Sequence, residues 1–391
     1  MAPERFSRVI LIVLDGVGVG ALPDAACFGD ADANTLRHVA EAVNGLDVPH
    51  LKQLGLGNIC PTPGLEPVPR PEAAWGKMAE ISCGKDTTTG HWELAGLPTV
   101  EPFATFPLGF PPEIMEPFEK MVGKPVLGNI AASGTDILRE LGEEHLRTGR
   151  LIVYTSVDSV FQIAAHEDVV PPGELYAICR SARDLLDPFR VGRVIARPFT
   201  GTSAVNFKRT HRRHDFSMPP PAPTLLDHLV ETGIPVKGIG KISDIFAGCG
   251  IAATLPTRDN RDGMAQIIDL LSESGRALVF ANLVDFDMLY GHRLDAAGFA
   301  DALAEFNRWL PELKAAMNDD DLLLLTADHG CDPTTSGTDH SREYVPLLAW
   351  HRNLQEGISL GVRNSFCDVA ATIAEAFGTG WPVGKSVIRQ L

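Results

Sequence analysis

Three separated segments of the chain carry acidic and imidazole side chains of the kinds that bind metal ions. The candidate ligands are Asp15, Asp287, His292, Asp328, His329 and His340. Carboxylates mixed with imidazoles suit two divalent cations such as Mn²⁺, Zn²⁺ or Mg²⁺. Cys331 lies beside these ligands and could be one of them, although a small packing residue is the favoured interpretation of a single cysteine.

A turn with three adjacent threonines, Thr87, Thr88 and Thr89, lies between the first of these segments and the others. If a helix begins here, its dipole and free N–H groups favour a phosphoryl group on one of the hydroxyls. Taken alone, the turn is more simply interpreted as a polar helix cap. With metal ligands in the same chain, a threonine nucleophile for phosphoryl transfer becomes the favoured interpretation.

The candidate ligands follow hydrophobic runs that are typical of buried parallel strands. We expect strands at Arg8–Leu14, Arg276–Leu283 and Asp321–Ala327. Because the ligand sites of open α/β sheets collect at the carboxyl ends of strands, we expect the three segments to form one site. Helices are expected between the strands, at Thr35–Val43, Pro223–Glu231, Asp259–Ser274, Ala297–Met317 and Asp368–Phe377. This alternation predicts a doubly wound α/β core.

The middle of the chain has a different pattern. Residues 101–124 are rich in Pro and Phe and are expected to be an irregular connection. Expected helices and strands then alternate at Thr135–Leu146, Leu151–Thr155, Val160–Ala165, Pro172–Leu186 and Val191–Ala196. A proline-rich linker, Met218–Pro223, follows. We therefore expect an inserted α+β cap domain at 101–220 within a core formed by 1–100 and 221–391.

Several cations of the expected cap domain could contact an anionic ligand. They are Arg193, Arg197, Lys208, Arg209, Arg212 and Arg213, and Lys241 follows after the linker. Each could equally be a solvated surface charge, but Arg197 ends an apolar strand and is the strongest candidate. Asp158, at the end of another expected strand, could bind sugar hydroxyls or cap a turn. Near the candidate metal ligands, Asp285, Asp332 and Asp339 are expected to orient ligands or cap turns.

The composition excludes several classes of protein. The chain has 391 residues, of which 45% are hydrophobic and 21% charged, as in an ordered globular protein. Its net charge of -16 argues against non-specific nucleic-acid binding. Seven dispersed cysteines without CxxC spacing fit a reducing compartment. No apolar run is long enough to span a membrane, so we expect a cytoplasmic protein that binds neither nucleic acid nor membrane.

Several motifs together resemble the phosphopentomutase family of the alkaline phosphatase superfamily. The resemblance runs nearly from end to end, and its motifs are VLDGVGVGALPD, GKDTTTGHWEL, YTSVDSVFQIAAHE, GRVIARPF, GIGKISDIF, NLVDFDMLYGHR and TADHGCDPTTSGTDHSREYVPLL. The resemblance implies an alkaline-phosphatase-like α/β core with an inserted cap, two Mn²⁺ ions and a phosphorylated threonine.

The resemblance also implies roles for individual residues. One metal is expected on Asp15, Asp328 and His329, and the other on Asp287, His292 and His340. The nucleophile is expected at Thr87, with Thr88 and Thr89 as alternatives that spacing does not separate. The positions that match sugar-phosphate contacts are Ser156, Asp158, Arg197, Arg209 and Lys241, with Arg212 as the alternative to Arg209.

The function implied by the resemblance is interconversion of the 1-phosphates and 5-phosphates of ribose and 2-deoxyribose. The threonine phosphate would pass to the sugar, giving a bisphosphate, and the other phosphate would return to the threonine. A sugar 1,6-bisphosphate activator is a further implication. A hydrolase or a phosphoglycerate mutase of the same superfamily is the alternative enzyme, and a catalytically inactive sugar-phosphate-binding protein is the alternative from another class.

Overall fold

A computed structural model describes residues 6–156 and 159–391 of the chain. The chain divides into two compact units, one formed by Met1–Glu101 with Pro220–Leu391 and the other by Pro102–Pro219. The first unit contains all six candidate metal ligands and the threonine turn. The assignment of the second unit as a cap remains a prediction.

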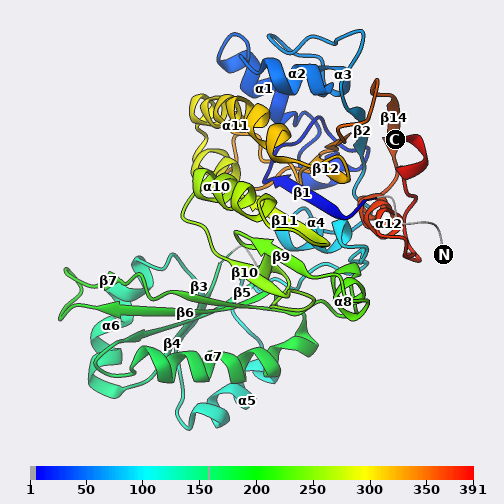
Figure 1. The fold of residues 1–391 in the computed structure, drawn as a ribbon. Coiled ribbons are helices and arrows are strands. Elements are labelled where there is room, and N and C mark those ends of the chain that lie inside the picture. Colours follow the sequence, from blue (N-terminus) through cyan, green and yellow to red (C-terminus); the bar gives the residue numbers. More distant parts are fainter. Residues whose placement is uncertain (1–5, 157–158) are drawn as a thin grey trace. The chain divides into compact units, whose positions relative to one another are not determined.

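The core of the first unit is an eight-stranded mixed sheet with the order β10-β9-β11-β1-β12-β13-β2-β14. Its strands are β1 (Arg8–Leu14), β2 (Ala74–Met78), β9 (Val236–Ile239), β10 (Ala253–Leu255), β11 (Ala277–Leu283), β12 (Asp321–Thr326), β13 (Val345–Trp350) and β14 (Ser359–Arg363). The central strand β1 pairs in parallel with β11 on one side and β12 on the other (Figure 1). Every residue of these three strands is buried, which explains their continuous hydrophobic runs.

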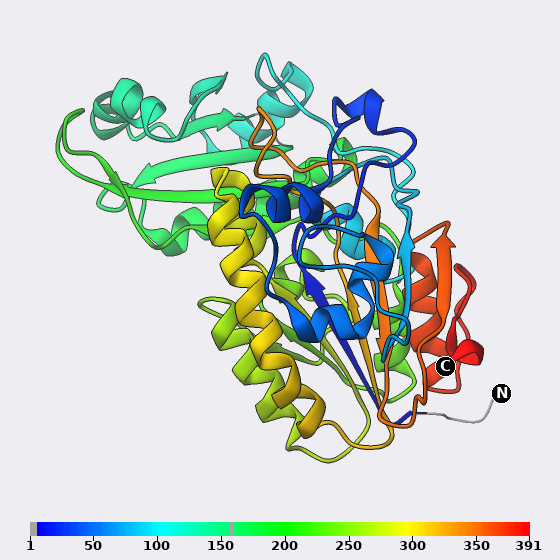
Figure 2. The same ribbon diagram turned by 90° about the horizontal axis from the view of Figure 1, so that it is seen from above.

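Helices cover both faces of this sheet. They are α1 (Thr35–Ala42), α2 (Pro49–Leu54), α3 (Leu56–Ile59), α4 (Thr87–Leu94), α8 (Leu225–Glu231), α9 (Ile242–Ile245), α10 (Asn260–Leu271), α11 (Ala296–Ala316) and α12 (Cys367–Ala376). Short 3₁₀ or π turns lie at η1 (Ala25–Phe28), η3 (Phe286–Tyr290), η4 (Gly291–Arg293) and η5 (Ile388–Gln390). Figure 2 shows α10 and α11, in yellow, on one side of the sheet and α12, in red, on the other. The doubly wound α/β class is therefore confirmed.

The second unit is built on a six-stranded sheet in which β3-β4-β5-β6-β7 follow in order and β8 also pairs with β6. Its elements are α5 (Pro112–Val122), β3 (Leu127–Ala131), α6 (Asp136–Thr148), β4 (Ile152–Thr155), β5 (Val160–His166), α7 (Pro172–Leu186), η2 (Asp187–Phe189), β6 (Arg193–Thr200), β7 (Lys208–Arg209) and β8 (His214–Ser217). Helices α5 and α7 pack on one face of this sheet, where they share a core with Val153, Phe161 and Val194.

The expected irregular connection at 101–124 is wrong in its second half, because α5 forms there. Pro112 occupies the first turn of α5, where a missing N–H costs nothing, and Gly123 ends the helix with a φ of 72°. Ile114, Met115 and Phe118 bury one face of the helix. Their packing stabilises α5 despite Pro117 in its interior. Because this packing involves residues distant in the sequence, the local pattern of 101–124 did not predict the helix.

Candidate metal centre

The six candidate metal ligands lie at the carboxyl ends of neighbouring strands in the first unit. Asp15 follows β1 directly, and Asp328 and His329 follow β12. Asp287 and His292 lie beyond β11, in the π turn η3 and the 3₁₀ turn η4. These two turns bring the carboxylate of Asp287 and the imidazole of His292 together.

The first group of side chains converges on one imidazole nitrogen. Nε2 of His329 lies 3.3 Å from Oδ1 of Asp15 and 3.3 Å from Oδ2 of Asp328. All three side chains are buried. Their donor atoms lie within 4.8 Å of one another, which is close enough for one ion to bind all three.

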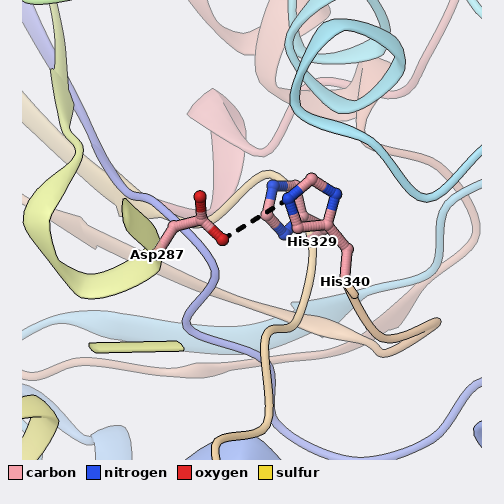
Figure 3. Close-up of side chains that lie close together, drawn as sticks. All are labelled: Asp287, His329 and His340. Carbon is pink, nitrogen blue, oxygen red and sulfur yellow. Dashed lines mark ion pairs between the residues drawn. The ribbon is translucent and has the colours of Figure 1, made fainter. Parts of the chain in front are cut away.

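The second group is built around Asp287. Its Oδ2 lies 3.2 Å from Nε2 of His292, and its Oδ1 lies 3.4 Å from Nε2 of His340. Figure 3 shows the Asp287 carboxylate directed at the imidazoles of His340 and His329. These two rings are stacked with centroids 3.9 Å apart, so the second group adjoins the first. The structure thus brings together all six residues that the sequence singled out.

Two of the imidazoles are oriented for metal binding by backbone carbonyls. Nδ1 of His329 lies 3.0 Å from the carbonyl oxygen of Gly330, and Nδ1 of His292 lies 2.6 Å from that of Thr338. An N–H at Nδ1 donates to these carbonyls, which leaves the lone pair of Nε2 directed at the carboxylates when the ring is neutral. This arrangement is typical of histidines that bind metal ions.

Three buried carboxylate oxygens in the centre accept no hydrogen bond: Oδ1 of Asp15, Oδ1 of Asp287 and Oδ2 of Asp328. Each lies 3.3–3.4 Å from an imidazole nitrogen of the centre. Burying a carboxylate oxygen without a partner is costly, and a bound cation removes that cost. The residues present therefore fit the divalent cations that hard oxygen and imidazole ligands prefer.

The electrostatics of the centre are those of strongly coupled opposite charges. Burial and the nearby carboxylates of Asp328 and Asp287 raise the pKa of Asp15. Burial also acts to raise the pKa of Asp328, but the positive charge of His329 and the contact with His91 outweigh it and lower this pKa to about 2. Burial acts to lower the pKa of His329, but the surrounding carboxylates raise it well above its usual value. The cluster therefore favours positive charge at its centre.

Cys331 lies close enough to Asp287 and His292 to form a third group of donor atoms. Burial raises the pKa of its thiol far above the usual range, and the negative charge of Asp287 adds to this shift. A thiolate is the form that binds metals, and it is strongly disfavoured here. The sulfur also contacts the position where a Cβ on Gly291 would lie, at 2.5 Å. These contacts support the packing role for Cys331.

Of the three adjacent threonines, only Thr87 reaches the metal centre through a described contact. Its Oγ1 lies 3.1 Å from Nε2 of His329. The hydroxyl of Thr89 instead donates to the backbone and side chain of Asp86, at 3.0 and 3.1 Å. The three threonines begin α4, as expected, but geometry separates them where spacing did not.

One expectation about this helix is wrong, because two of its first N–H groups are not free to bind a phosphoryl group. Asp86 is the N-cap of α4, and its Oδ1 accepts hydrogen bonds from the N–H groups of Thr88 and Thr89, at 3.0 and 3.1 Å. The polar cap and the candidate nucleophile therefore coexist in one turn. The capped N–H groups of Thr88 and Thr89 therefore contribute to the site only through the helix dipole.

The neighbouring acids make contacts with backbone N–H groups, as the expected capping role requires, whereas no hydrogen bond to the ring of a candidate ligand is described for them. Asp285 accepts a hydrogen bond from the backbone of Asn260, at 2.8 Å, at the start of α10. Asp332 lies 2.6 Å from Nδ1 of His38 and accepts from the backbone of Asn34. Asp339 accepts from the N–H of His340 and pairs with Lys85, at 3.2 Å. This last contact joins the loop that carries His340 to the threonine turn.

The second unit gathers several cations on one face of its sheet. Arg197 lies on β6 and donates from Nε to Oε1 of Gln162, at 3.1 Å. Burial lowers the pKa of Arg197, and the positive charges of Arg213 and Arg209 lower it further. Burial raises the pKa of Tyr154 on β4, while the positive charges of the same three arginines act to lower it, so all three lie near this residue. A group of like charges of this kind favours an anion.

The structure distinguishes the two arginines between which the sequence left a choice. Arg212 is exposed and forms an ion pair with Glu167, at 3.0 Å, whereas Arg209 belongs to the group around Tyr154. Ser156 follows β4 and is partly buried. Asp158 lies outside the described residues. Lys241 belongs to the first unit, as the N-cap residue of α9, and its positive charge acts on Asp285.

Sequence reasoning did not assign roles to two residues that contact the centre, His91 and Asn282. His91 is fully buried, and its Nδ1 lies 3.1 Å from Oδ2 of Asp328. Asn282, on β11, donates from Nδ2 to Oδ2 of Asp15, at 2.9 Å. The four-residue spacing between Thr87 and His91, which places both on one helix face, is the signal that could have revealed His91.

Comparison with known proteins places the chain in a class. A sequence model of the Metalloenzyme superfamily matches residues 7–380. Among solved structures, the PH0037 protein of Pyrococcus horikoshii matches with a TM-score of 0.50 at 14% identity, over 98% of this chain and all of that one. The match to the superfamily model and the clustered carboxylates and imidazoles define a metalloenzyme, and the PH0037 protein shares its α/β fold.

Curated relatives narrow the class further. Phosphopentomutase of Syntrophotalea carbinolica is 59% identical over 391 residues, which is 100% of both chains. Phosphopentomutase of Caldanaerobacter subterraneus is 56% identical over 98% of each chain, and that of Carboxydothermus hydrogenoformans is 54% identical over 97% of this chain. The chain belongs to the phosphopentomutase family. Within residues 6–156 and 159–391, no helix has the length and apolar character needed to cross a membrane.

Proposed function

We propose that this enzyme interconverts the 1-phosphates and 5-phosphates of ribose and 2-deoxyribose through a phosphothreonine at Thr87. The observation that supports the mechanism most directly is the contact between Oγ1 of Thr87 and Nε2 of His329, at 3.1 Å. This contact joins a single hydroxyl to the buried cluster of carboxylates and imidazoles. The full-length relatives named phosphopentomutase support the substrate class.

The residues present suit a centre for two divalent cations, and we propose Mn²⁺ for both. Asp15, Asp328 and His329 would hold one ion, and Asp287, His292 and His340 the other. When bound, the ions would stabilise the alkoxide of Thr87 and the negative charge on the phosphoryl group in transfer. The buried carboxylates supply the charge that retains the ions, and the backbone carbonyls of Gly330 and Thr338 keep two imidazoles in place.

The proposed cycle conserves phosphate and protons. A hydroxyl of the incoming sugar monophosphate attacks the phosphorus on Thr87, the bond from phosphorus to Oγ1 breaks, and the hydroxyl proton is transferred to the threonine oxygen. The resulting sugar bisphosphate reorients, and Oγ1 of Thr87 attacks its other phosphate while the proton returns to the sugar. A sugar 1,6-bisphosphate would load the threonine for the first cycle.

We assign the binding of the sugar phosphate to the second unit and to Lys241. Arg197 and Arg209 supply positive charge around Tyr154, and Ser156 supplies a hydroxyl at the end of β4. Asp158 keeps its expected role with sugar hydroxyls. The proposed mechanism requires that water be excluded from the phosphothreonine, because water would convert the mutase into a phosphatase.

Substrate conversion tests this proposal. The Mn²⁺-loaded enzyme should convert ribose 1-phosphate to ribose 5-phosphate much faster than it releases inorganic phosphate. Thr87→Ala should abolish conversion and keep the metal content, because Thr87 adds only a hydroxyl contact to a cluster that other residues form. Release of inorganic phosphate as the main reaction would instead support a hydrolase. Full activity in Thr87→Ala would contradict the assigned nucleophile.

A further inference from the structure

A buried chain of hydrogen-bonding groups links the two carboxylates of the first metal-binding group from behind. It runs from Asp15 through Asn282 and His91 to Asp328. Nδ2 of Asn282 donates to Oδ2 of Asp15, at 2.9 Å, and lies 3.3 Å from Nε2 of His91. Nδ1 of His91 lies 3.1 Å from Oδ2 of Asp328. None of these four side chains is more than 1% exposed.

The donors and acceptors of this chain fit a single arrangement. The amide of Asn282 has two N–H groups, of which one reaches Asp15 and the other reaches Nε2 of His91. Nε2 of His91 therefore accepts, and its Nδ1 carries a proton. That N–H donates to the carbonyl oxygen of Thr87, at 2.9 Å, and Nδ1 lies beside Oδ2 of Asp328. His91 thus contacts both a candidate ligand and the backbone of the candidate nucleophile.

The register of the sheet explains why these groups meet. Val13 of β1 pairs with Asn282 on β11 and with Thr326 on β12, so these three residues share a face of the sheet. Asp15 and Asp328 each lie two residues further along, beyond the ends of β1 and β12, and Asn282 contacts Asp15 directly. His91 reaches this face from α4 and stacks on Phe280 of β11, with ring centroids 5.8 Å apart.

We propose that His91 and Asn282 are positioning residues that orient the carboxylates of Asp15 and Asp328 and so set the metal affinity of this half of the centre. The proposal rests on the proposed metal-dependent function. Outer groups that orient metal ligands typically change metal affinity by about 10–100-fold when they are removed. His91 has a second effect, because it connects the carboxylate of Asp328 to the backbone carbonyl of Thr87. The two residues would then couple the metal site to the position of the nucleophile.

Four variants test the proposal. His91→Phe keeps an aromatic ring against Phe280 and removes the donor, whereas His91→Asn keeps an N–H attached at the equivalent Cγ. Asn282→Leu keeps the approximate shape and removes both N–H groups. The matched control is Trp92→Phe, the next residue on α4, which loses a hydrogen bond to the carbonyl of Ile245, at 3.1 Å, and touches neither carboxylate in the contacts described.

The readout is calorimetric titration of each metal-free protein with Mn²⁺ alone, with circular dichroism as the check of folding. His91→Phe and Asn282→Leu should weaken one of the two binding events by about 10–100-fold and leave the other within about threefold. His91→Asn should recover most of the lost affinity, and Trp92→Phe should bind as the unsubstituted protein does. If His91→Phe does not fold, the Mn²⁺ affinities of Asn282→Leu and His91→Asn are compared instead.

Wild-type Mn²⁺ affinity in folded Asn282→Leu and His91→Phe would overturn the proposal. An equal loss in Trp92→Phe would also overturn it, because the effect would then belong to the packing of α4. The proposed function and the positioning role of His91 and Asn282 can be contradicted by different results. Absence of sugar phosphate conversion in the Mn²⁺-loaded unsubstituted protein would contradict the proposed function, whereas the effect of the variants on Mn²⁺ binding would still decide the positioning role.

Discussion

Gly90 of α4 packs directly against the backbone carbonyl of Asp328. A Cβ added at Gly90 would lie 2.2 Å from that carbonyl oxygen and 2.9 Å from its carbon, closer than real contacts allow. Thr87 lies one turn before Gly90 on the same helix. The absence of a side chain at position 90 therefore lets the candidate nucleophile approach the metal centre.

Gly90→Ala should displace α4 and lower both stability and Mn²⁺ affinity. Alanine favours a helix interior over glycine by about 1 kcal/mol, but forcing a methyl group into a packed site typically costs about 1–3 kcal/mol. We expect a net loss of stability and at least a tenfold loss of activity. Thermal unfolding and titration with Mn²⁺ check this. The control is Gly173→Ala on α7, where an added Cβ meets nothing within 4 Å and should be tolerated.

Asp86→Ala should destabilise the protein by about 0.5–2 kcal/mol, because it removes an N-cap that accepts two hydrogen bonds. Asp86→Asn keeps a capping oxygen and should retain most of that stability. Urea unfolding of the two variants measures the difference. Equal stability of Asp86→Ala and the unsubstituted protein would show that the cap contributes nothing.

Metal binding should release protons and strengthen with pH. Hydrogen bonding to Asp287 raises the pKa of His292, and the carboxylates around His329 outweigh burial and raise its pKa well above the usual value. Without metal, both rings therefore keep their protons to higher pH than a free imidazole does, and only the neutral ring binds metal. Apparent Mn²⁺ affinity should keep rising as the pH passes above the ordinary range of a histidine and should level off only above the raised pKa values.

Calorimetry in two buffers of different ionisation enthalpy measures these protons directly. The observed enthalpy of Mn²⁺ binding should differ between the buffers in proportion to the protons released. Identical enthalpies in both buffers, with an affinity that does not change with pH, would contradict the protonated state inferred for His329 and His292.

Arg197→Ala should raise the KM for ribose 5-phosphate by about 10–100-fold, as expected for a lost charge-assisted hydrogen bond of about 1.5–3 kcal/mol. Mn²⁺ affinity should not change, because Arg197 belongs to the second unit. Arg212→Ala is the matched comparison, since its guanidinium pairs with Glu167 at the surface. We expect less than about a threefold effect, because exposed ion pairs contribute little. An increase in KM for Arg212→Ala as large as that for Arg197→Ala would contradict the choice of Arg209 over Arg212.

The sequence predicted the parts of the fold that depend on buried, continuous patterns. Arg8–Leu14 and Asp321–Thr326 are hydrophobic runs at the centre of the sheet, and both strands begin where expected. Strands β2, β9, β10, β13 and β14 of this sheet were not anticipated, and β13 is an exception to the pattern because all of its residues are buried. β14 is a short edge strand of mixed exposure, and β2 alternates buried with partly buried residues. Such short patterns become strands only when neighbouring strands pair with them.

For the site, too, the sequence predicted the residue types but not the contacts that depend on the fold. Residue types and their positions after strands predicted the six candidate ligands, because carboxylates and imidazoles that cluster at strand ends usually form a ligand-binding or catalytic site. The sequence could not separate Thr87 from Thr88 and Thr89, since only the fold shows which hydroxyl faces His329. It also could not show that Asp86 occupies the N–H groups of the helix, or that His91 contacts Asp328.

The central claim is that phosphate passes through Thr87, and its location on the protein is the most direct test. The Mn²⁺-loaded enzyme should be incubated with a pentose bisphosphate, digested, and mapped by mass spectrometry. The account predicts phosphate on Thr87 and its transfer to ribose 5-phosphate when that sugar is added. An active enzyme with phosphate on Thr88, on Thr89 or on no threonine would contradict the account.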